Sequence, residues 1–204
     1  GHVNVFISEY SIGKWNMNCV ADVIHHSVDT EVFQPREVQA ESAPEVLSVV
    51  NDFKNRDYCC NYSGWKRVSS EFNTKLVGSC SEGLSKPADS IEDLVNEYNS
   101  AKVFLNTSTI SPVPTSLLEA MSCGSAVVST ATCMIPEIIE NGVNGFISND
   151  EEELKSYIKT LLEDDELRSK MGTAARETVL NNFSEEKFIN NWNKTFDKTY
   201  GVKR

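Results

Sequence analysis

The sequence predicts an α/β fold: a Rossmann-like parallel sheet flanked by helices, followed by a helical C-terminal tail. Three observations support this fold class. Short apolar runs alternate with segments of helical periodicity between residues 45 and 148, which is typical of β-α-β units. The run at 46–50 is apolar without clean alternation, as in strands that are buried on both faces. A hydrophobic content of 40% and a charged content of 24% over 204 residues are those of a folded globular chain.

The expected strands are short, and most are followed by a loop rich in glycine or polar residues. In chain order, the strands of the sheet are Val46–Val50, Thr74–Val77, Ala101–Leu105, Ala126–Ser129 and Phe146–Ile147. Val3–Ser8 also has strand character, but it precedes the sheet and has no obvious partner strand.

The expected helices lie between these strands and fill the C-terminal part of the chain. They cover 57–70, 90–98 and 115–123, a short segment that opens at Pro136, and most of the chain after Asp150. Ser90 is the predicted N-cap of the second helix, with Asp93 three residues later, which is close to a capping box. Gly124 follows the third helix at the position where glycine favours a helix end.

Composition excludes several classes of function. The formal net charge of −11 argues against binding to the backbone of a nucleic acid and against docking on anionic lipid. No apolar run approaches the length of a membrane span, and no basic segment followed by an apolar one opens the chain, so we expect a cytoplasmic protein. The six cysteines form no zinc-type spacing, so we expect reduced thiols and no metal.

The loop after the third strand is the most informative place for chemistry, because ligands of open parallel sheets bind at the carboxyl ends of the strands. It is rich in Ser and Thr and leads into a helix whose first turn holds Thr115 and Ser116. The N–H groups of such a turn favour an anion. Lys54 and Arg56, after the first strand, can add positive charge, and Glu119 lies one turn further along the helix. A carboxylate there can accept two hydrogen bonds from a ribose diol, so the pattern predicts a nucleoside diphosphate site.

A purely structural interpretation stays open at this point. Ser or Thr before a helix often acts only as an N-cap. A carboxylate in an early helical turn can simply complement the helix dipole, and the two basic residues can be solvated surface charges.

The segments Leu118–Val128 and Ile135–Phe146 resemble the donor-binding half of the group 1 (family 4-like) glycosyltransferases, which have the GT-B fold. Val23–Phe33 is similar to the inter-domain linker of that family. The resemblance implies two Rossmann-like domains that face each other across a cleft, with the sugar nucleotide held by the C-terminal one.

The resemblance also assigns roles to individual residues. It implies that Glu119 binds the ribose and that the backbone N–H groups of Thr115 and Ser116 meet the diphosphate. The basic residues that the family places after the first strand fall near Lys54 and Arg56. No cofactor or metal is implied, because the helix tip and the basic side chains carry the charge of the leaving group.

Four departures from the family pattern stand out. Ser111 occupies the first acidic position of the Glu-x7-Glu motif, and it is kept as a candidate contact to the donor sugar. Residues 112–114 read Pro-Val-Pro instead of Gly-Phe-Gly, and 133–134 read Cys-Met instead of a glycine pair, which puts side chains where backbone otherwise approaches the sugar. Residues 78–89 are too few for the usual additional helix and strand, so we expect a reduced sheet.

The expected organisation has three parts. Residues 1–33 are the remnant of an N-terminal domain and the crossover, 34–45 are a linker with two prolines, and 46–204 form the nucleotide-sugar-binding domain. The N-terminal strand leaves two alternatives: it folds back on the domain, or it pairs with a second copy of the chain in a homo-oligomer.

The sequence leaves three functions to compare. The first is a hexosyltransferase of polysaccharide biosynthesis that uses a nucleoside diphosphate sugar as donor substrate and a glycan or other molecule as acceptor, this chain carrying the donor-binding half. The second is a non-catalytic nucleotide-sugar-binding or interaction module derived from that domain. The third, a nicotinamide-dependent dehydrogenase, is disfavoured because no G-x-G-x-x-G follows any expected strand.

Overall fold

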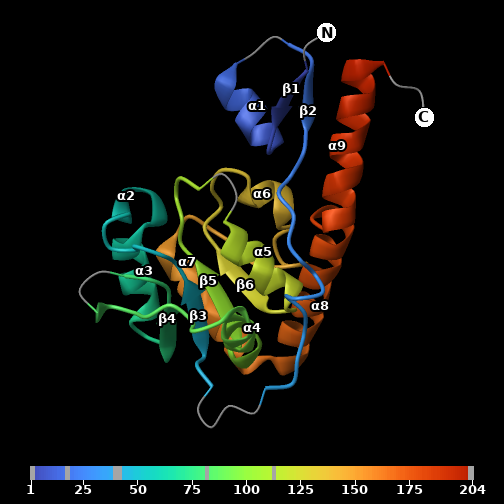
Figure 1. Ribbon diagram of the computed structural model, residues 1–204. Coiled ribbons are helices and arrows are strands. Elements are labelled where there is room, and N and C mark those ends of the chain that lie inside the picture. The colour runs from blue at the N-terminus through green and yellow to red at the C-terminus, as the bar shows by residue number, and fades with distance from the viewer. Residues whose placement is uncertain (1–2, 17–18, 39–42, 81–82, 112–113, 202–204) are drawn as a thin grey trace.

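The computed structural model describes residues 3–16, 19–38, 43–80, 83–111 and 114–201, and it confirms the predicted α/β fold class. Its centre is a five-stranded sheet, parallel throughout, with the strand order β4-β3-β5-β6-β7 (Figure 1). The strands are β3 (Val46–Val49), β4 (Thr74–Val77), β5 (Val103–Asn106), β6 (Ala126–Ser129) and β7 (Phe146–Ile147).

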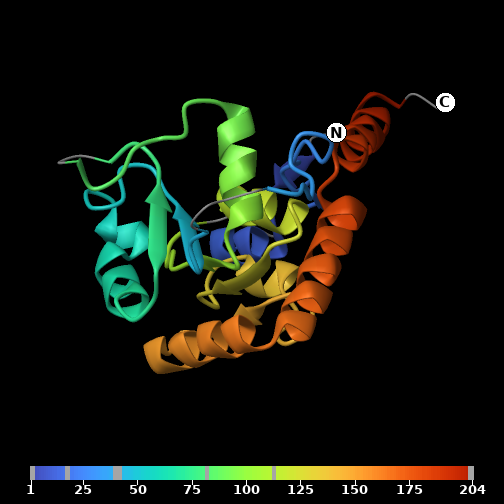
Figure 2. The same cartoon turned by 90° about the horizontal axis from the view of Figure 1, so that it is seen from below.

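Helices cover both faces of this sheet. Figure 2 shows α4 on one side of the strands and α7 on the other. One face packs against α4 (Ile91–Ser100), α5 (Thr115–Ser122) and α8 (Asp165–Asn182). The other face packs against α3 (Tyr62–Ser69) and α7 (Glu151–Glu163). None of the helices within the described ranges is long and apolar enough to cross a membrane.

Successive strand residues belong to opposite cores, which accounts for the uninterrupted apolar runs in the sequence. Val46 and Val103 pack on the side of α3 and α7, whereas Leu47 and Phe104 pack on the side of α4, α5 and α8. All four side chains are at most 2% exposed. Because both faces of a central strand are buried, every position favours an apolar side chain.

The helix expected over 57–70 is two helices, so that prediction was wrong in detail. The chain forms α2 (Asp57–Cys60), and then Asn61 adopts a left-handed conformation with φ 58°. The Asn61 side chain accepts a hydrogen bond from Gly64 N at 3.1 Å and caps α3. Asparagine tolerates this conformation better than most residues, so the break lies at Asn61. The predicted cap of α4 is confirmed, since Ser90 Oγ accepts from Asp93 N at 3.0 Å.

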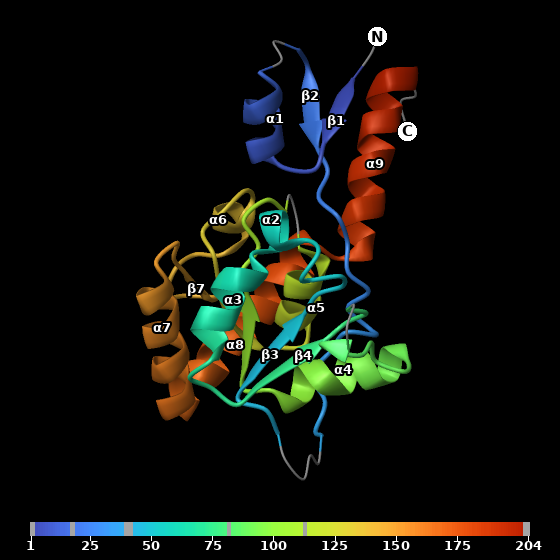
Figure 3. The same ribbon diagram turned by 90° about the vertical axis from the view of Figure 1, so that its left-hand side faces the viewer.

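The N-terminal part forms a small unit of its own. The strand expected at residues 3–8 is β1 (Asn4–Phe6), and it pairs in parallel with β2 (Ala21–Val23) after the short helix α1 (Glu9–Trp15). The strand therefore finds a partner within the chain. The last helix, α9 (Glu185–Tyr200), runs beside this unit in Figures 1 and 3.

Hydrogen bonds to Glu137 and from α9 to Asp22 join the N-terminal unit to the rest of the molecule. Glu137, in the short helix α6 (Ile135–Ile138), accepts hydrogen bonds from Glu9 N at 3.1 Å and Tyr10 N at 2.6 Å, so it caps α1 from outside. Asp22 of β2 accepts hydrogen bonds from Thr195 Oγ1 at 2.6 Å and Lys198 Nζ at 2.8 Å on α9.

Candidate functional site

The strand order creates a crevice between β3 and β5. The chain runs from β3 to β4 on one side and then crosses to β5 on the other side of β3. In open α/β sheets such a switch point, at the carboxyl ends of the strands, is where ligands bind. A cavity of about 370 Å³ lies there. The described residues that line it are Val49, Val50, Asn51, Arg56, Cys60, Leu94, Asn106, Ser108, Ser111, Pro114, Thr115, Ser116 and Glu119.

The cavity brings together five of the six residues predicted from the sequence. Their roles remain predictions, but Arg56, Ser111, Thr115, Ser116 and Glu119 all line it.

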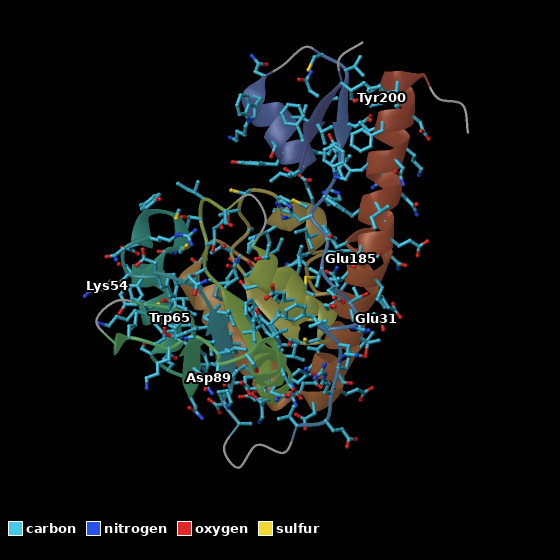
Figure 4. All side chains as sticks on the ribbon, in the orientation of Figure 1. Glu31, Lys54, Trp65, Asp89, Glu185 and Tyr200 are labelled. Atoms are coloured by element: carbon cyan, nitrogen blue, oxygen red, sulfur yellow. The ribbon has the colours of Figure 1, made fainter. Side chains whose placement is uncertain are left out.

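Lys54, the sixth predicted residue, is not among the described lining residues. Figure 4 shows it at the outer edge of the molecule. The positive charge contributed by the segment after β3 therefore comes from Arg56, which is the one Lys or Arg among the described lining residues.

The N-terminus of α5 lies at the cavity, and no side chain among the described residues caps its first turn. Its N-cap is Pro114, whose side chain makes no capping hydrogen bond. The carbonyl of Pro114 accepts from Leu117 N and Leu118 N, whereas the N–H groups of Thr115 and Ser116 donate to no group among the described residues. Free N–H groups together with the positive end of the helix dipole favour an anion. The tip is therefore suited to a phosphate group.

A network of buried hydrogen bonds fixes the loop that precedes this tip. Asn106 Nδ2 donates to Ser129 Oγ at 2.8 Å, and its Oδ1 accepts from Ser108 Oγ at 2.9 Å. Thr107 Oγ1 donates to the carbonyl of Cys60 at 3.1 Å, which ties the loop to α2. The sequence did not single out Asn106 and Ser108 as site residues. Their position at the carboxyl end of a buried strand is the signal that could have found them.

Glu119 is the one carboxylate among the described lining residues. Its Oε2 accepts a hydrogen bond from Tyr98 Oη at 2.7 Å. Burial raises the pKa of Glu119, and the hydrogen bond from Tyr98 acts in the opposite direction. Burial also raises the pKa of the neighbouring Cys60 to about 11, so Cys60 presents a neutral thiol to the cavity.

The departures from the family pattern have structural counterparts. Ser111 lines the cavity, so a hydroxyl stands where the family has a carboxylate. Cys133 adopts φ 51°, a left-handed conformation that favours glycine, and its Sγ lies 3.6 Å from the carbonyl of Thr109. Met134 is fully buried in the core, so its side chain does not reach the cavity. Pro112 and Val113 lie outside the described residues.

The fold defines the class of protein: a Rossmann-like α/β domain of the GT-B type. Sucrose-phosphate synthase from Thermosynechococcus elongatus superposes on 98% of this chain with a TM-score of 0.80 and 15% identity, and this chain covers 59% of it. Anabaena HepE, solved in complex with UDP, superposes on 97% of this chain with a TM-score of 0.76 and 16% identity, and 63% of it is covered.

Residues 87–178 match the family model described as Glycosyl transferases group 1, so this segment is similar to that family. N-acetyl-alpha-D-glucosaminyl L-malate synthase from Bacillus anthracis is 37% identical over 78 residues, which are 37% of this chain and 20% of that protein. Spore coat protein SA from Bacillus subtilis is 30% identical over 111 residues, or 52% and 29% of the two chains. The matches span 18% to 29% of the length of the curated relatives.

Proposed function

We propose that this chain is the donor-binding part of a glycosyltransferase that moves a hexosyl group from a nucleoside diphosphate sugar to a glycan-type acceptor, as in polysaccharide biosynthesis. One observation carries the proposal: the uncapped first turn of α5 and the carboxylate of Glu119 line the same cavity. The family match and the likeness to a UDP complex support the same ligand class.

The proposed binding mode assigns each part of the cavity to a part of the donor. The N–H groups of Thr115 and Ser116 and the guanidinium of Arg56 hold the diphosphate, and the same groups stabilise it as the leaving group. Glu119 accepts hydrogen bonds from the ribose diol. Since the helix tip and Arg56 supply the positive charge, the proposal includes no metal.

A second candidate is a binding module that holds the nucleotide sugar without turning it over. Ser111 favours it, because a hydroxyl replaces the carboxylate that the family places near the donor sugar. The two functions differ in one measurable property. Incubation of the protein with UDP-glucose, GDP-mannose or ADP-glucose releases free nucleoside diphosphate if the hexosyl group passes to water or to an added glycan acceptor, and it releases none if the chain only binds.

The binding mode is tested by calorimetric titration with UDP, GDP and ADP. We expect one of them to bind, and we expect Glu119→Ala to weaken that binding by about 1.5–3 kcal/mol, the usual value of hydrogen bonds to a charged group. Glu92→Ala, on an exposed position of α4, is the matched control and should bind as the wild type does. Equal affinity of the Glu119→Ala protein and the wild type would refute the ribose assignment.

A further inference from the structure

A buried tyrosine lies behind the carboxylate of the proposed site. Tyr98 is on α4, its side chain is 1% exposed, and its hydroxyl donates to Glu119 Oε2 at 2.7 Å. Aromatic neighbours hold the ring on two sides: the centroid of Phe33 lies 6.1 Å away in an edge-to-face arrangement, and that of Phe104 lies 5.8 Å away. Packing therefore fixes where the phenol hydroxyl can be.

The two carboxylate oxygens of Glu119 differ in their surroundings. Oε2 faces the core and is held by Tyr98. No group among the described residues donates a hydrogen bond to Oε1, and Glu119 lines the cavity. A carboxylate that is anchored through one oxygen loses little rotational freedom when the other oxygen accepts a ligand hydrogen bond, and such preorganisation improves affinity.

We infer that Tyr98 is a positioning residue for nucleotide binding: it fixes the rotamer of Glu119 and thereby presents Oε1 to the ribose diol. This inference rests on the proposed function. Its chemistry is specific to the hydroxyl, because a phenylalanine at the same position would keep the ring packing and lose only the hydrogen bond.

The electrostatic surroundings of Glu119 give this role a measurable signature. The titratable groups that interact with it are Tyr98 from α4 and Cys123, which directly follows α5, and Arg56 and Cys60 line the same cavity. Burial raises the pKa of Glu119, and the hydrogen bond from Tyr98 lowers it. Burial also raises the pKa of Tyr98, so the phenol stays a neutral donor at physiological pH. Removal of the hydroxyl should therefore raise the pKa of Glu119 further.

The experiment compares Tyr98→Phe with the wild type in titrations with UDP, or with GDP or ADP if one of them binds more tightly, between pH 5 and pH 8. We expect Tyr98→Phe to bind about 3- to 10-fold more weakly at pH 7, as for the loss of one hydrogen bond. We also expect its affinity to decline at a higher pH than that of the wild type, because the binding-competent carboxylate is protonated earlier. The titration of the nucleotide itself is common to both proteins and cancels in the comparison.

Two further variants separate positioning from structure. Tyr157→Phe, whose ring stacks on Phe146 in another part of the fold, is the matched control and should leave the pH profile unchanged. In a Glu119→Ala background, Tyr98→Phe should have little further effect, because the two residues act through one contact. A Tyr98→Phe protein with the wild-type pH profile, or with additive losses in the double variant, would overturn the inference.

A readout without ligand distinguishes failure of the inference from failure of the proposed function. The pKa of the Glu119 carboxyl can be followed by 13C-detected NMR in the free wild-type and Tyr98→Phe proteins. A rise in the variant supports the inference, and an unchanged pKa overturns it. If the wild type binds none of the nucleotides, the proposed function fails and the ribose role fails with it, whatever the NMR titration shows.

Discussion

At the scale of single residues, the charge of the cavity depends on one cation, Arg56, and one anion, Glu119, among the described lining residues. Lys54 lies two positions away in the sequence but not in the cavity wall. The two basic residues form a natural pair for an experiment, since they share a loop and a charge and differ in where they lie.

We expect Arg56→Ala to weaken the binding of UDP and to leave the binding of uridine nearly unchanged, because the guanidinium acts on the diphosphate. Arg56 is exposed, so solvent screening limits the loss to about 0.5–1.5 kcal/mol. Lys54→Ala should cost clearly less. Titrations with UDP and uridine at two salt concentrations check this, and an equal loss for both ligands would contradict the role assigned to Arg56.

The residues of the site differ in how far the sequence could predict them. Thr115, Ser116 and Glu119 are set by spacing along one helix, so a sequence motif is enough to place them on one face. The sequence places Tyr98 at the end of the helix expected over 90–98, but its hydroxyl contact depends on the distance between α4 and α5. That distance is a tertiary quantity, which helical periodicity does not contain.

At the scale of secondary-structure elements, short strands and breaks between helices are the hardest features to predict from the sequence. Uninterrupted apolar runs predicted the central strands within a few residues, because a strand buried on both faces favours an apolar residue at every position. The break between α2 and α3 depends on the backbone conformation of a single residue, Asn61. β2 has only three residues, Ala21–Val23, which is too short for a periodic signal.

The packing of α8 on the end of α5 offers a prediction at this scale. A Cβ atom at Gly172 of α8 would lie 2.1 Å from the carbonyl oxygen of Gly124, which is a backbone atom that cannot move alone. We expect Gly172→Ala to lower the free energy of unfolding by about 1–3 kcal/mol, as other overpacked contacts do. Urea denaturation measures the effect.

Gly13 of α1 is the matched control, because a Cβ atom there would meet nothing within 4 Å. Gly13→Ala should cause no loss of stability, since alanine is the better helix former. If Gly172→Ala were as stable as the wild type, the two helices would have to separate without cost, and the close contact would not be a constraint on the fold.

At the scale of the whole molecule, the N-terminal unit is held between α6 and α9. Glu137 caps α1, and Asp22 joins β2 to the C-terminal half of α9. In Figure 4 the far end of α9, marked by Tyr200, lies beside this unit. The helix therefore spans from the α/β unit to the N-terminal unit, and its polar contacts decide how firmly the two units are joined.

The hydrogen bonds of Asp22 should make the attachment of the N-terminal unit to α9 depend on pH. Hydrogen bonds from Lys198 and Thr195 lower the pKa of Asp22 in the folded protein. The stabilising contribution of Asp22 is therefore complete above its pKa in the unfolded chain, and it is lost as the pH falls through its pKa in the folded protein.

We expect Asp22→Asn to speed amide hydrogen exchange in β1, β2 and the end of α9 at pH 7, while the central sheet stays protected. Acidification below about pH 4 should reduce the difference from the wild type, because Asp22 is then increasingly protonated in the wild type. Lys198→Met should have a similar but smaller effect at pH 7, because Asp22 keeps its hydrogen bond from Thr195 Oγ1. The double variant should add little to the change in Asp22→Asn, because both substitutions act on the same contact. Additive increases in exchange, or a difference that grows on acidification, would mean that another contact holds the N-terminal unit to α9.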